Sequence, residues 1–93
     1  MAQVEVRLTL HDDAVSWLPV EGQVVVLDLR TARYLSLNDS AARLWAVLAG
    51  GGTVGDLVAS LRDEFGIDEL EATRDVGAFL DDLRQRGLLD EAG

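Results

Sequence analysis

The chain has no cysteine and no lysine, a single histidine, a single proline and only 5% aromatic residues. Without cysteine it can form neither a disulfide bond nor a thiolate nucleophile. His11 has no second metal ligand at a suitable spacing, and the sequence has no Gly-x-Ser-x-Gly turn. We therefore predict no metal site, no cofactor and no catalytic residue, and we expect a protein that is not an enzyme.

The chain also lacks a long apolar run. Nothing in it approaches the roughly 20 consecutive apolar residues of a membrane span, and its N-terminus alternates polar and apolar residues, unlike a signal peptide. We expect no membrane partner and a cytoplasmic location. The 93 residues, 48% of them hydrophobic, suffice for one modest core. We therefore treat 1–93 as a single domain.

Positive charge is scarce, with 17 acidic residues against 8 arginines and a net charge of -9. Residues 56–91 hold 11 of the acidic residues and 4 of the arginines, a net of -7. Such a surface repels phosphate backbones and anionic membranes, so we expect no nucleic-acid partner. A winged-helix regulator of transcription remains an alternative by fold analogy, but it would need a basic recognition helix.

The spacing of the apolar residues predicts strands in the N-terminal part of the chain. Alternation indicates a strand at 4–10, which Asp12-Asp13 ends. Residues 15–20 are extended, and Pro19 confines them to an edge or a loop. After a turn at Glu21-Gly22, strands at 23–29 and 33–37 form a hairpin around the turn 30–32.

Three helices are predicted after the hairpin, at 39–49, 54–65 and 69–86, each followed by glycine. Asn38 or Asp39 caps the first, and Thr53 with Asp56 forms a capping box for the second. Each helix is expected to carry one apolar stripe. The stripes are Ala41, Leu44, Trp45 and Leu48 on the first helix; Val54, Leu57, Val58, Leu61 and Phe65 on the second; and Ala72, Val76, Phe79, Leu80 and Leu83 on the third. Leu88-Leu89 is expected to pack back on the core. The fold class is α+β and winged-helix-like, with an N-terminal three-stranded antiparallel sheet followed by three helices.

A family resemblance extends over about residues 20–90. It rests on Val26-Leu27-Asp28-Leu29, Tyr34-Leu35, Leu37-Asn38, Ala41, Leu44-Trp45, Leu48 and Gly50, and continues through Thr53-Val54, Asp75-Val76, Phe79-Leu80, Leu83 and Gly87-Leu88-Leu89. At these positions the sequence resembles that of the PqqD-like proteins, also called RiPP recognition elements. The chain is most similar to the stand-alone leader-binding protein of lasso-peptide biosynthesis. Ala32 stands in a turn where relatives often have glycine.

The resemblance implies a peptide-binding function without catalysis. The leader segment of a ribosomally synthesised precursor would add as a strand to the hairpin edge, in a groove between the third strand and the third helix. The precursor would then be presented to maturation enzymes, a cysteine-protease partner that removes the leader and an ATP-dependent cyclase.

The residues themselves support such a site, because an edge strand offers unpaired N–H and C=O groups to an extended peptide. Phe79 and Leu80 point about 100° apart, so either both lie in the core or one of them lines the groove. We interpret Tyr34 as a half-buried packing residue. The candidate peptide-binding residues are Arg33, Tyr34, Leu35, Ser36 and Leu37 of the strand, and Asp75, Val76, Phe79, Leu80, Asp82 and Leu83 of the helix. Among them Leu35, Leu37, Val76, Phe79, Leu80 and Leu83 are the expected walls, and Arg33, Asp75 and Asp82 the rim.

A second alternative is an acyl-carrier-like domain modified at Ser40. Carriers are small, acidic and helical, and attach phosphopantetheine to a serine that follows an aspartate, as Asp39-Ser40 would provide. They are four-helix bundles without N-terminal strands, however, and Ala41 replaces the usual leucine or isoleucine. We therefore favour Ser40 as a first-turn residue of the first helix.

Overall fold

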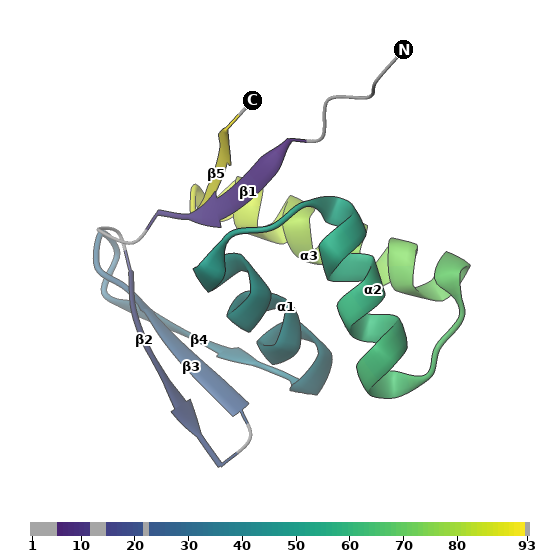
Figure 1. Cartoon of the computed structure of the whole chain (residues 1–93). Helices are drawn as coiled ribbons and strands as arrows, with labels where there is room; N and C mark the ends of the chain where they lie inside the picture. The colour runs from purple at the N-terminus through teal and green to yellow at the C-terminus, as the bar shows by residue number, and fades with distance from the viewer. Residues whose placement is uncertain (1–5, 12–14, 22, 93) are drawn as a thin grey trace.

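The computed structural model describes residues 6–11, 15–21 and 23–92, which form five strands and three helices (Figure 1). In chain order these are β1 (Arg7–Leu10), β2 (Val15–Val20), β3 (Gln23–Asp28), β4 (Arg33–Leu37), α1 (Asp39–Gly50), α2 (Val54–Phe65), α3 (Glu69–Arg86) and β5 (Leu89–Ala92). The α+β class, with a three-stranded antiparallel sheet and three helices, is confirmed. The first residues of the strand predicted at 4–10, the break at Asp12-Asp13 and Gly22 of the predicted turn lie outside the described residues.

The three-stranded sheet has the order β2-β3-β4, and all its pairs are antiparallel. Val26 of the central strand lies opposite Trp17 on one side and Leu35 on the other. Pro19 therefore lies on an edge strand, where its missing N–H costs no ladder hydrogen bond, as predicted. Figure 1 shows this sheet to one side of α1, with α2 to the other.

β1 lies outside this sheet and pairs with β5, a strand that the sequence did not predict. The register places Leu10 opposite Leu89 and Arg7 opposite Ala92. Leu8 also exchanges backbone hydrogen bonds with Gly52, at 2.6 and 3.0 Å. Leu89 is buried as expected, but the residues after it also form a strand, so the two ends of the domain are joined to each other and to the α1–α2 loop.

The helix termini carry the predicted caps. Asn38, rather than Asp39, caps α1, because its side chain accepts a hydrogen bond from the Ala41 N–H at 2.9 Å. Thr53 and Asp56 form the capping box of α2, with reciprocal hydrogen bonds of 3.2 and 3.0 Å. Gly87 ends α3 in the left-handed conformation, with a φ of 69°. The helix boundaries are therefore set by local chemistry that is visible in the sequence.

Trp45 of α1 is fully buried at the centre of the core, as are Leu48, Leu57 and Leu61, all as predicted. Its ring meets Trp17 of β2 edge-on, with centroids 6.1 Å apart and planes at 77°. The stripe predicted for α2 is wrong at its ends. Val54 and Phe65 are 44% and 41% exposed, because they are the first and last residues of the helix, where less of the neighbouring structure covers a side chain. Among the described residues, no helix is both long and apolar enough to cross a membrane.

The central place of Trp45 yields a stability prediction. Trp45→Ala should lower the free energy of unfolding by about 3–5 kcal/mol, because it removes a large buried side chain and leaves a cavity. Trp17→Ala is the matched control and should cost clearly less, since Trp17 is already 37% exposed. Urea unfolding followed by circular dichroism measures both. A Trp45→Ala variant as stable as the wild type would contradict the assigned core.

Candidate functional site

β4 is an edge of the three-stranded sheet, and within the described residues β3 is its only strand partner. In an antiparallel edge strand, alternate residues direct their N–H and C=O groups away from the sheet. The turn before β4 is tight, since the Ala32 N–H donates to the Asp28 carbonyl at 2.8 Å and Ala32 has a φ of 58°. That left-handed conformation favours glycine. β4 thus leaves backbone groups free beside the helices.

The side chains of β4 alternate between the two faces of the sheet. Leu35 is half-buried and Leu37 buried on the face that packs against the core. Tyr34 and Ser36 lie on the other face, and Tyr34 is 75% exposed. The interpretation of Tyr34 as a half-buried packing residue is therefore wrong, because the helices cover the opposite face of the sheet.

α3 divides into two faces. Val76, Leu80 and Leu83 are at most 3% exposed and belong to the core. These three cannot be groove walls as expected, since they have almost no surface left for a ligand; they support the helix from within. Phe79 is half-buried, packed against the core with part of its ring accessible. Of the pair Phe79 and Leu80, it is thus Phe79 that can line a groove.

Two hollows lie along α3, the first between this helix and the β3–β4 hairpin and the second between this helix and the start of α1. One, of about 480 Å³, is lined by Val26, Asp28, Thr31, Arg33 and Leu35 of the hairpin and by Gln85, Arg86 and Leu88. The other, of about 300 Å³, is lined by Asn38, Ser40, Ala41 and Leu44 and by Asp75, Ala78, Phe79 and Asp82 of α3. We refer to the two together as the β4–α3 groove. It contains the predicted residues Arg33, Leu35, Asp75, Phe79 and Asp82.

Sequence reasoning missed several residues of the groove. On α3 these are Ala78, Gln85 and Arg86, which continue the face of Asp75 and Asp82 at spacings of three and four residues. That spacing was the available signal for them. Thr31, from the turn before β4, carries no comparable signal, because its place depends on how the hairpin meets α3.

Arg30 joins the hairpin to the end of α3. Its side chain donates to the Arg86 carbonyl at 2.6 Å, and its backbone N–H and Nε donate to the Asp28 carboxylate at 3.0 and 3.5 Å. The backbone hydrogen bond above all holds the pKa of Asp28 below its ordinary value. Asp28 therefore contributes stability at neutral pH that is lost as the pH falls through this lowered pKa.

The charges of the groove differ between its ends. Arg33 and Arg86 lie at the end near the hairpin turn, and Asp75 lies at the end near α1. Asp82 is between them and accepts from Arg86 Nε at 3.2 Å. The groove thus runs from an arginine-rich end, where Asp28 is paired with Arg30, to an acidic end.

Known proteins match both the sequence and this arrangement. The family model described as coenzyme PQQ synthesis protein D (PqqD) matches residues 23–89. The chain belongs to the PqqD family. It is a PqqD-like RiPP recognition element, as the sequence resemblance predicted.

Two solved structures share the fold of this PqqD-like domain. TbiB1, in complex with the TbiA(beta) leader peptide, is 31% identical with a TM-score of 0.78, over 84% of this chain and 91% of that one. A lasso peptide synthetase B1, complexed with the leader peptide, is 28% identical with a TM-score of 0.77, over 89% of this chain and 96% of that one. No curated protein matches the chain.

The acyl-carrier alternative is wrong. Ser40 lies on the first turn of α1, and its hydroxyl donates to the Asn38 side chain at 3.2 Å. The chain around it contains two antiparallel sheets, whereas a carrier is a helical bundle, and the family match runs through this segment. Within the described parts of the chain, no group of three or more histidine and carboxylate residues could hold a metal ion.

Proposed function

We propose that this PqqD-like domain binds the leader segment of a ribosomally synthesised precursor peptide in the β4–α3 groove, with the leader added as a strand to β4. The observation that carries the proposal is the free edge of β4 beside a groove on α3. It is supported by the 31% identity to TbiB1, whose structure holds a leader peptide. The pathway we propose is lasso-peptide biosynthesis.

Backbone pairing alone would bind a leader weakly. Each added hydrogen bond contributes about 0.5–1.5 kcal/mol net, and four or five of them barely offset the cost of ordering an extended peptide. Affinity must therefore come from apolar leader side chains seated in the groove. Leu35 and Phe79, both half-buried, are the surfaces that such anchors would contact.

The charges of the groove would select the register of the leader. An acidic leader residue would be favoured near Arg33 and Arg86, and a basic residue near Asp75. The same peptide shifted or reversed would place like charges together. The rim charges would thus contribute more to specificity than to affinity.

The domain would act by presentation and not by catalysis. A leader held as a strand along β4 leaves the rest of the precursor outside the groove, accessible to other enzymes. The partners we propose are a cysteine protease that removes the leader and an ATP-dependent cyclase. We place this step in the cytoplasm, where the precursor is made.

Phe79→Ala tests the groove. It should weaken leader binding by about 1–3 kcal/mol, as the loss of a buried anchor contact does, with a smaller loss of folding stability. The measurement is an anisotropy titration with the fluorescein-labelled cognate leader. Leu70→Ala is the matched control, because Leu70 is on the same helix but 64% exposed and outside the groove. Equal affinity of Phe79→Ala and wild type would place the leader elsewhere.

A proline scan through the central residues of the same leader tests strand addition. Proline has no N–H, so it removes the hydrogen bond wherever the replaced residue donates to β4. At least one position should abolish binding, and its neighbours, which point away from β4, should tolerate proline better. Unchanged affinity across the whole scan would rule out strand addition.

A further inference from the structure

The β4–α3 groove does not end where β4 ends. A third hollow, of about 360 Å³, lies around the N-terminus of α1 and shares Asn38, Ser40 and Asp75 with the groove. Its other walls include Phe65, the last residue of α2, and Ile67 of the α2–α3 loop. A peptide that passes the end of β4 therefore meets an open surface and not a wall.

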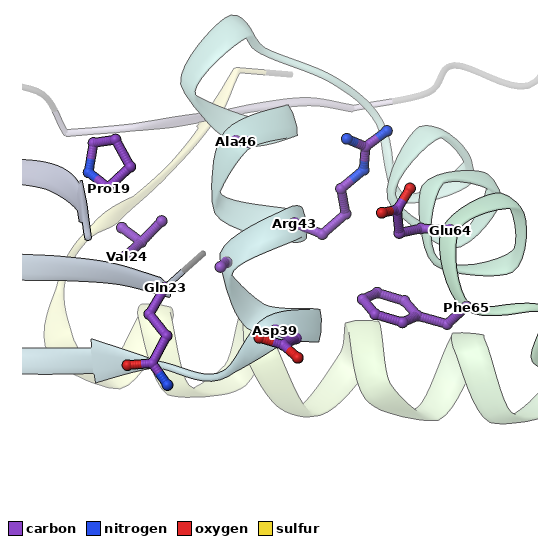
Figure 2. Close-up of a pocket in the computed structure, with 9 residues that line it drawn as sticks. Pro19, Gln23, Val24, Asp39, Arg43, Ala46, Glu64 and Phe65 are labelled. Carbon is purple, nitrogen blue, oxygen red and sulfur yellow. The ribbon is translucent and has the colours of Figure 1, made fainter. Parts of the chain in front are cut away.

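A fourth hollow, of about 390 Å³, continues from the third and shares Asp39 and Phe65 with it (Figure 2). Its floor is the part of α1 that carries Ala42 and Ala46, and the charged residues Arg43 of α1 and Glu64 of α2 also line it. Pro19 of the β2–β3 hairpin forms one wall and Phe65 the other. Figure 2 shows the Phe65 ring directed from α2 toward α1. We call the third and fourth hollows together the flank track.

We propose that the flank track binds the segment of the leader that follows on from the strand paired with β4. This inference rests on the proposed function and extends it to a second contact region. The occupant is assigned by continuity. The hollow between α1 and α3 shares lining residues with the third hollow, and the third shares lining residues with the fourth. The hollow beside β4 joins this series along α3, where Arg86 of one hollow pairs with Asp82 of the next. The leader would turn around the N-terminus of α1 and lie along that helix.

The dimensions suit a short extended segment. From Asp39 to Ala46 the helix rises about 10 Å, at about 1.5 Å per residue. An extended peptide covers that distance with about three residues. The leader would thus need about three residues beyond the bend at Asp39 to reach the Ala46 end of the track.

The lining indicates which residues those would be. Asp39 and Asp75 flank the bend, and neither is in an ion pair with another described residue. A lysine or arginine of the leader would be favoured there, with its aliphatic stem on Phe65. Beyond the bend, the surface of Ala42 and Ala46 between Pro19 and Phe65 fits a small or medium apolar side chain. Arg43 and Glu64, which line the same hollow, would contact polar groups of the leader beside it.

Ala46→Trp tests the flank track, because the indole would fill it. Ala46 is exposed on α1, so the variant should keep its fold, which thermal melting checks. Ala59→Trp is the matched control on the exposed surface of α2. Each protein is titrated with the labelled full cognate leader, and with leaders shortened by three residues at a time from either end.

Ala46→Trp should weaken binding of the full leader by at least about fivefold, as loss of a packed contact does, and Ala59→Trp should leave it unchanged. Shortening the leader from one end should remove the difference in affinity between Ala46→Trp and wild type. The end whose removal does so contains the segment that binds in the flank track. Wild-type affinity of Ala46→Trp for the full leader would overturn the inference, as would an equal defect with every shortened leader. Failure of the wild type to bind any of these leaders would instead overturn the proposed function.

Discussion

The cap that Asn38 places on α1 is the constraint on which the rest of the arrangement depends. β4 ends at Leu37 and α1 begins at Asp39, so Asn38 alone makes the change from strand to helix by accepting the Ala41 N–H. The chain has no room there for another strand to cover the edge of β4. Within α1 the chain enters the core at Leu44 and Trp45. The short junction thus excludes a strand directly after β4, and the other described strands outside this sheet, β1 and β5, pair with each other.

A free strand edge is a hazard for aggregation, and this fold limits it. β4 has only five residues, and the charged side chains of Asp75, Asp82 and Arg86 of α3 line the groove beside it. The core face of α3 holds the helix in place through Val76, Leu80 and Leu83. Its groove face is left for recognition, so changes at Phe79 can affect binding separately from folding. Arg30 fixes one end of the groove by joining the hairpin turn to the last turn of α3.

The sequence was most informative where local chemistry decides the structure. The capping box at Thr53, the glycines that end the helices and the hairpin turn before β4 all depend on neighbours in the chain. β5 was missed because its four residues, including Asp90 and Glu91, carry no clear alternation. Its partner β1 is about 80 residues away in sequence, and pairing over such a separation leaves no local signal.

The candidate site was predicted in part for the same reason. The helical period placed Asp75, Phe79 and Asp82 on one face of α3, and the structure brings them to the groove. It could not decide between Phe79 and Leu80, because both border the apolar stripe and only the packing of α3 against its neighbours separates them. Nor could it give the exposure of Tyr34. Alternation shows that Tyr34 lies on the opposite face of the strand from Leu35. Whether that face is covered depends on the tertiary structure, which alternation does not reveal.

Amide hydrogen exchange of β4 tests the central claim most directly. Exchange rates of the Arg33–Leu37 amides are measured by NMR in the free protein and in the presence of saturating leader peptide. Strand addition predicts that alternate amides of β4, those directed away from β3, exchange fast in the free protein and are strongly protected on binding. A leader that binds tightly but leaves those amides exchanging at their free rates would contradict it.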